Sequence, residues 1–206
     1  MSLAPWLDAC PLIAILRGIR PDEAVAIGGA LLDAGLTILE VPLNSPSPFE
    51  SIRRLHEAYG ERALVGAGTV MTEDDVAGIV HAGGKLMVTP HADPALVLAA
   101  RARGLIACPG FFTPSEAFGV LAAGATALKF FPAEGASPAM LKAMMAVLPK
   151  GTPVLPVGGI GPHNLAEWRK AGAAGFGIGS SIYQPGDTPE AVGAKARALI
   201  AALPGA

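Results

Sequence analysis

A lysine and a glutamate are placed by this sequence inside short apolar runs. Lys129 lies in Ala127-Leu128-Lys129-Phe130-Phe131, a run that stops at Pro132 and is typical of a buried parallel strand. A free lysine has a pKa of about 10.4, so only about one in 2,500 is neutral at pH 7. Apolar burial lowers that pKa, and a neutral amine can attack a carbonyl carbon to form an imine. Lys129 is therefore a candidate nucleophile; a lysine that extends to solvent or pairs with an acid is the alternative.

Glu40 is the carboxylate of the second such run, Thr37-Ile38-Leu39-Glu40-Val41-Pro42. Apolar surroundings raise the pKa of a carboxyl group and allow it to carry protons near neutral pH. An imine needs such a partner, because water must leave the carbinolamine and a proton must move at the adjacent carbon. Glu40 and Lys129 are therefore predicted to be the catalytic pair. The alternative for Glu40 is a buried ion pair with Arg17.

Two glycine-containing segments follow the last two apolar runs of the chain, at Val157-Gly158-Gly159-Ile160 and at Gly177-Ile178-Gly179-Ser180. Glycine lets the backbone N–H groups approach an anion closely, and the hydroxyl of Ser180 adds a donor. In (β/α)8 barrels the loops after the seventh and eighth strands commonly bind phosphate. The two segments therefore predict a phosphate site, although glycine also forms tight turns.

Three further residues end apolar runs and are predicted to bind substrate. Arg17 carries a permanent charge and could hold either a carboxylate or a phosphate. Thr69 offers a hydroxyl, or instead caps the helix expected to begin at Thr72. Pro90 follows Thr89 at the end of the fourth run.

Eight apolar runs alternate with Ala-rich amphipathic segments along the chain, and this alternation predicts parallel strands joined by helices. The expected helices begin at caps such as Thr72 and Thr113 and end at glycines such as Gly35 and Gly124. We expect one (β/α)8 barrel domain over residues 1–206, with a short N-terminal helix near residues 3–9 before the first strand; a doubly wound open sheet is the alternative. The runs are 12–16, 38–41, 64–67, 86–88, 105–107, 127–128, 154–157 and 176–178.

Closure of such a barrel would bring the second and sixth strands face to face across its interior. Catalytic residues of this architecture lie at the carboxyl ends of the strands. Glu40 and Lys129 would then reach the same ligand.

Composition excludes several classes of function. The chain has 206 residues, is 51% hydrophobic and 16% charged, and carries a formal net charge of −2. It has no basic stripe, so a nucleic-acid partner is not expected. No apolar run reaches membrane-spanning length and no leader pattern opens the chain, which predicts a cytoplasmic protein with no membrane partner. The two cysteines and four scattered histidines show no metal-ligand spacing, which argues against a metal site.

Five segments together resemble the class I 2-keto-3-deoxy-6-phosphogluconate/phosphogalactonate aldolases, over nearly the whole chain and in order. The resemblance implies reversible cleavage of a phosphorylated keto acid to pyruvate and D-glyceraldehyde 3-phosphate. It also implies Lys129 as the Schiff-base lysine, Glu40 as the proton carrier, a homotrimer, and no metal or organic cofactor. The segments are 11–19 (PLIAILRGI), 40–46 (EVPLNSP), 66–70 (GAGTV), 127–132 (ALKFFP) and 157–160 (VGGI).

Within that family, the sequence is similar to the phosphogalactonate branch rather than the phosphogluconate branch. Asn44 stands where the phosphogluconate branch has arginine, so Arg17 and Thr69 become the candidates for binding the substrate carboxylate. Val157 stands in place of a threonine, and loss of a pocket hydroxyl could change which C4 epimer is accepted. We therefore expect 2-dehydro-3-deoxy-6-phosphogalactonate as substrate, with the phosphogluconate compound as the alternative. A sugar-phosphate isomerase or epimerase, or a phosphosugar-binding regulator without catalysis, are the remaining alternatives.

Overall fold

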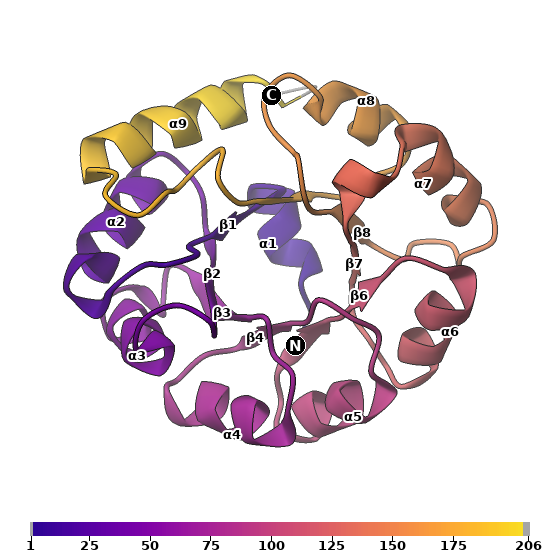
Figure 1. Ribbon diagram of the computed structural model, residues 1–206, viewed down its shortest axis with the longest axis horizontal. Helices are drawn as coiled ribbons and strands as arrows, with labels where there is room; N and C mark the ends of the chain where they lie inside the picture. The colour runs from indigo at the N-terminus through magenta and orange to yellow at the C-terminus, as the bar shows by residue number, and fades with distance from the viewer. Residues whose placement is uncertain (1, 204–206) are drawn as a thin grey trace.

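The computed structural model describes residues 2–203, in which short parallel strands form an inner ring, the first helix is seen within this ring, and the later helices lie outside it (Figure 1). The strands are β1 (Leu12–Ile15), β2 (Ile38–Pro42), β3 (Leu64–Gly68), β4 (Leu86–Val88), β5 (Ile106–Cys108), β6 (Gly110–Phe111), β7 (Leu128–Phe130), β8 (Val154–Pro156) and β9 (Phe176–Ile178). The helices are α1 (Ala4–Ala9), α2 (Pro21–Asp33), α3 (Pro48–Tyr59), α4 (Glu73–His81), α5 (Pro94–Ala102), α6 (Pro114–Ala122), the 3-10 turn η1 (Ala133–Gly135), α7 (Pro138–Met145), α8 (Leu165–Lys170) and α9 (Pro189–Ala201).

The expected alternation of parallel strands and helices is confirmed. Strand pairing gives a six-stranded sheet in the order β5-β4-β3-β2-β1-β9 and a three-stranded sheet in the order β6-β7-β8. All the recorded strand pairs are parallel. The single continuous eight-stranded sheet that we expected is not found, because the strands divide into these two sheets.

The fifth expected strand differs most from the prediction. The sequence placed it at 105–107, whereas the structure has β5 at Ile106–Cys108 and, after Pro109, the additional strand β6, which pairs with β7. Pro109 separates the two because proline has no N–H to donate to a neighbouring strand. The carbonyl of Pro109 still accepts a hydrogen bond from the backbone N–H of Lys129. Lys129 itself lies inside β7, which extends beyond the run 127–128 expected for this strand.

Every strand is buried along its length, and alternate residues enter two different apolar clusters. Ile13, Ile38 and Ala127 belong to the cluster inside the ring, which also contains Leu3 and Leu7 from the α1 segment. Their neighbours along the strands, such as Leu39 and Leu128, pack instead in the cluster between strands and helices. Successive side chains of a strand point to opposite faces, so this alternation determines which residues face the interior.

Helix starts and ends follow the local signals in the sequence. Thr72 and Thr113 cap α4 and α6 by accepting hydrogen bonds from Asp75 N and Glu116 N. Gly35 and Gly124 follow α2 and α6 with φ of 103° and 95°, a backbone conformation that glycine adopts without strain. The predicted N-terminal helix is confirmed as α1. None of the helices in the described range has the length and apolarity that crossing a membrane would require.

Candidate active site

Glu40 and Lys129 occupy the next interior layer beyond the apolar cluster. Glu40 lies two residues after Ile38 on β2, and Lys129 lies two residues after Ala127 on β7, so both share a face with residues inside the ring. Parallel pairing aligns Glu40 with Ile15 on β1 and Lys129 with Gly110 on β6. Glu40 is 2% exposed and Lys129 5% exposed. The two predicted catalytic side chains are therefore both buried inside the ring.

Burial shifts the pKa of each group in the direction that favours its neutral form. Desolvation lowers the pKa of the Lys129 amine, and the Arg17 charge adds to this, while the nearby Glu40 and Cys108 oppose it. Desolvation likewise raises the pKa of the Glu40 carboxyl, against the attraction of Lys129 and Arg17. Glu40 Oε2 is buried without a hydrogen-bond partner in the structure. The site thus favours an uncharged amine beside a carboxyl group that can hold a proton.

Gly68 makes the room that Glu40 occupies. A Cβ atom at position 68 would lie 1.1 Å from Glu40 Oε1, so no other residue type fits while Glu40 keeps this position. The next residue, Thr69, has φ of 57°, which is a strained conformation for a β-branched side chain. Thr69 does not cap the following helix, since Thr72 does so.

Two adjoining cavities contain most of the predicted residues. The smaller is about 10 Å³ and is lined by Glu40, Cys108 and Lys129, together with apolar side chains. The larger is about 190 Å³, and it shares Ile15 and Val157 with the smaller one. Its lining includes the predicted residues Arg17, Val157, Gly158, Gly159, Gly179 and Ser180.

The glycine loop after β8 is open to an anion. Gly158 and Gly159 have φ of 104° and 66°, and within residues 2–203 no recorded hydrogen bond uses the backbone N–H groups of Gly159 or Ser180. The loop is held by Asn164, whose Nδ2 donates to the carbonyl of Gly159 at 2.9 Å and whose Oδ1 accepts from the N–H of Gly161 at 3.0 Å. Unpaired N–H groups on a fixed loop suit a phosphate.

Arg17 does not form the buried ion pair with Glu40 that was the alternative in the sequence. Its Nη1 donates to Asn44 Oδ1 at 2.7 Å, and the arginine is exposed at the edge of the larger cavity. Thr69 and Pro90 line neither cavity. The backbone of Pro90 instead packs against Gly110, where a Cβ would come within 2.6 Å of it.

Three side chains at the site were not predicted to act there. The ring of Phe131 has its centroid 4.5 Å from Lys129 Nζ. Glu134 lines the larger cavity and Cys108 the smaller one, where burial raises the pKa of the Cys108 thiol to about 12. The spacing of Phe131, two residues after Lys129 in an extended segment, is the signal that could have identified it.

A larger cavity than either of these lies elsewhere. It measures about 580 Å³ and is lined by residues that precede β1 and β9, including Cys10, Pro11 and Ala174. It is therefore at the amino ends of the strands, away from Glu40 and Lys129. Among residues 2–203, no group of three or more His, Cys, Asp or Glu side chains is arranged to hold a metal ion.

The chain is similar to known proteins in sequence and in overall structure. The model of the family "KDPG and KHG aldolase" matches residues 5–191. The 2-dehydro-3-deoxy-6-phosphogalactonate aldolase of Escherichia coli K12 is 46% identical over 197 residues, which is 96% of each chain. A native KDPGal structure superposes with a TM-score of 0.92 at 47% identity, covering 93% of both chains.

A more distant relative has been solved with a reaction intermediate. It is the KDPG aldolase of Legionella pneumophila, with pyruvate captured at low pH as a covalent carbinolamine intermediate, and its TM-score is 0.87 at 28% identity. The alignment covers 97% of this chain and 98% of that one. On the extent of the family match and of these likenesses, the chain belongs to the KDPG and KHG aldolase family.

Proposed function

We propose that this enzyme reversibly cleaves 2-dehydro-3-deoxy-6-phosphogalactonate to pyruvate and D-glyceraldehyde 3-phosphate, through a Schiff base on Lys129. The observation that carries the proposal is a buried amine in the same interior layer as a buried carboxyl group, beside a cavity lined by glycine loops. Membership of an aldolase family and the 46% identity to a phosphogalactonate aldolase support the same reaction.

The first half of the reaction forms the iminium ion. The neutral amine of Lys129 attacks the C2 ketone, and a proton moves from nitrogen to oxygen to give the carbinolamine. The protonated carboxyl of Glu40 then donates its proton to that hydroxyl, water leaves, and the nitrogen becomes a positively charged iminium. Glu40 is left as a carboxylate near C4.

The second half breaks the carbon–carbon bond. The Glu40 carboxylate removes the proton of the C4 hydroxyl, and the C3–C4 electron pair flows toward the iminium nitrogen to give an enamine and the aldehyde. Glu40 returns the proton to C3, and this forms the iminium of pyruvate. Attack by water, with Glu40 accepting its proton, releases pyruvate and restores the amine.

The larger cavity holds the phosphate end of the substrate in this proposal. The N–H groups of Gly158, Gly159, Gly179 and Ser180 would surround the phosphate oxygens, since anions bind at such exposed backbone donors. Arg17 is at the edge of the same cavity and, together with Thr69, is the candidate for the substrate carboxylate. Pro90 stays a predicted substrate-binding residue.

Preference for the galacto epimer rests on Val157 and Asn44. Val157 lines both cavities and offers no hydroxyl, and Asn44 accepts the hydrogen bond from Arg17. A Val157→Thr variant that left the ratio of kcat/KM for the two C4 epimers unchanged would remove the support of Val157 for this preference. The phosphogluconate compound is the alternative substrate.

Trapping with borohydride tests the catalytic assignment. Incubation with pyruvate and borohydride is expected to add the mass of a reduced pyruvyl group to the peptide that contains Lys129. Lys129→Met is the control that should take up none. Modification at Lys85 instead would refute the assignment of Lys129, whereas activity retained by Lys129→Arg would favour an isomerase or epimerase. A failure to produce pyruvate in a lactate dehydrogenase-coupled assay would favour a regulator without catalysis.

At the scale of the whole chain we propose one closed (β/α)8 barrel over residues 1–206. The parallel bridge between Val157 and Gly177 supports closure between β8 and β9, and Pro109 links β5 directly to β6.

We also propose a homotrimer, supported by the exposed apolar side chains of Leu98 and Phe118 on the neighbouring helices α5 and α6. Light scattering should give about three times the chain mass of 20.8 kDa. A cytoplasmic location and the absence of a cofactor stay predictions from the sequence.

A further inference from the structure

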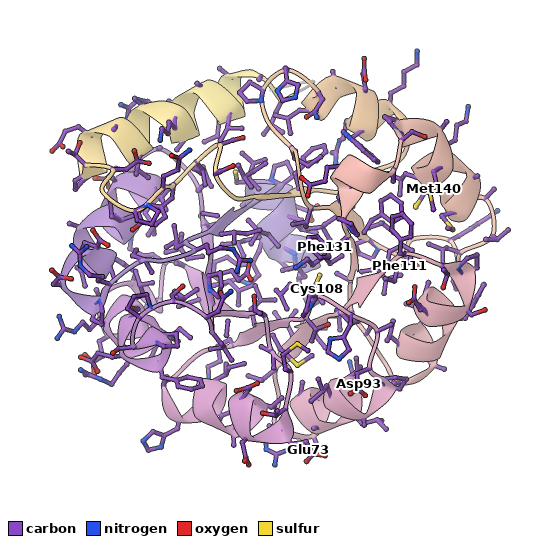
Figure 2. The ribbon with its side chains drawn as sticks, in the orientation of Figure 1. Glu73, Asp93, Cys108, Phe111, Phe131 and Met140 are labelled. Atoms are coloured by element: carbon purple, nitrogen blue, oxygen red, sulfur yellow. The ribbon has the colours of Figure 1, made fainter. Side chains whose placement is uncertain are left out.

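Phe131 faces the amine of Lys129. Its ring centroid lies 4.5 Å from Lys129 Nζ, and Figure 2 shows Phe131 and Cys108 near the centre of the ring of strands. Phe130, which lies between Lys129 and Phe131 in the sequence, points to the other face and packs against Phe111 and Trp168. The alternation of side chains in an extended segment therefore places Lys129 and Phe131 on the same side.

The proposed reaction presents an electrostatic difficulty at this nitrogen. The site is dry enough to disfavour a positively charged amine, yet the iminium ion carries a positive charge on the same atom. The charged or titratable groups around it are Glu40 from β2, Cys108 from β5 and Arg17 after β1. Arg17 repels a cation, the Cys108 thiol is neutral, and Glu40 gains and loses its proton during the cycle. None of these gives a constant stabilisation of the iminium.

An aromatic face gives such a stabilisation without titrating. The ring quadrupole attracts a cation within about 6 Å of the centroid, and the attraction is stronger where water is excluded. Phe131 is half-buried and also lines the larger cavity beside Gly158 and Glu134. The ring thus lies between the reacting nitrogen and the predicted phosphate site.

We propose that Phe131 is a catalytic residue whose ring face stabilises the iminium formed on Lys129. This inference rests on the Schiff-base reaction proposed above. It goes beyond that reaction by assigning the stabilisation of the cationic intermediate to a side chain that carries no charge.

A ring that attracts the cation and a ring that only excludes water predict different changes in the pKa of the Lys129 amine. If the ring attracts the cation, a weaker quadrupole makes both the ammonium and the iminium less favourable, so the pKa of Lys129 falls further and less iminium forms. If the ring only excludes water, fluorines that change its size little should leave the pKa of Lys129 unchanged, and any loosening that admits solvent would raise this pKa toward its usual value.

The experiment incorporates phenylalanine with one, two or three ring fluorines at position 131 of the full chain. Fluorine withdraws electrons from the ring face and changes its size little. The readouts are the pyruvate concentration for half-maximal borohydride trapping on Lys129 and the pH dependence of the trapping rate. We expect the half-maximal concentration to rise with each fluorine, by about tenfold in total, which corresponds to about 1.4 kcal/mol. The pKa of Lys129 should fall along the series.

Phe112 provides the matched control, because it is also half-buried but stacks on Phe130, with a centroid separation of 5.6 Å. Fluorination there should leave trapping unchanged. Equal half-maximal concentrations along the Phe131 series, a pKa that rises, or an equal effect at Phe112 would overturn the role of Phe131. Absence of any adduct on Lys129 in the unsubstituted protein would instead overturn the Schiff-base function itself.

Discussion

The two buried titratable residues have different consequences when each is removed. Glu40→Gln keeps the size of the side chain but cannot carry a proton, so we expect kcat to fall by about a hundredfold or more. Lys129 is intact in this variant, and prolonged incubation with pyruvate and borohydride should still label it. The rates of pyruvate release and of trapping, measured side by side, check this. A variant with near-normal kcat would contradict the role of Glu40.

Lys129→Met should abolish cleavage and make the fold more stable at neutral pH. A group whose pKa is lowered by folding contributes stability above its unfolded pKa, of about 10.4, and loses it as pH falls through the folded pKa. The gain of the variant over the unchanged protein should therefore be largest at low pH and shrink as pH rises toward about 10.4. At its largest, the gain in unfolding free energy amounts to about 1.4 kcal/mol for each unit by which folding lowers the pKa of Lys129.

Urea denaturation of both proteins between neutral and alkaline pH measures this difference. A stability difference that did not change with pH would mean that Lys129 is not held neutral by burial. The same lysine would then need another route to an unprotonated amine.

At the scale of an element, β3 provides the space that a functional side chain of the neighbouring strand β2 occupies. Glu40 on β2 aligns with Gly66 on β3, and its carboxyl fills the space beside Gly68. The end of β3 needs a glycine at position 68 because any larger residue would occupy the space of the Glu40 carboxyl.

Gly68→Ala tests this arrangement. The added methyl group would displace Glu40, so we expect a loss of activity comparable to that of Glu40→Gln and a decrease in unfolding free energy of about 1–3 kcal/mol. Gly119→Ala in α6 is the control, since its Cβ would meet only Pro94 Cγ at 3.9 Å. That change should leave activity intact and increase stability by about 0.5–1 kcal/mol. Steady-state kinetics and urea denaturation check both variants, and an active Gly68→Ala would contradict the packing argument.

At the scale of the whole molecule, the single closed barrel proposed above should unfold as one unit. Trp6 in α1 and Trp168 in α8 report on different parts of the chain, and Trp168 packs on Phe130. Two single-tryptophan proteins, Trp6→Phe and Trp168→Phe, are therefore expected to give the same unfolding midpoint by fluorescence and by circular dichroism, after allowance for any shift of the whole curve. Two separate transitions within one protein would indicate more than one domain.

The strands and helices were determined by local sequence. Short apolar runs bounded by glycine, proline or polar residues are typical of interior parallel strands, and caps such as Thr72 and glycines such as Gly35 act on their own helix ends. Lys129 and Glu40 could be identified from the same apolar runs. Burying a charged residue in such a run costs free energy unless the residue is paired, so its presence there indicates a function.

Other features were decided only by the tertiary structure. Arg17 donates to Asn44 rather than to Glu40, Pro109 divides the fifth strand, and the ring of Phe131 lies over Lys129 Nζ. The clearance of Gly68 for Glu40 is a fourth example. The sequence by itself determined which segments are buried and which charges are out of place, because burial patterns are local. Which groups meet depended on strand order and register, because those contacts join residues that are far apart along the chain or depend on the directions of their side chains.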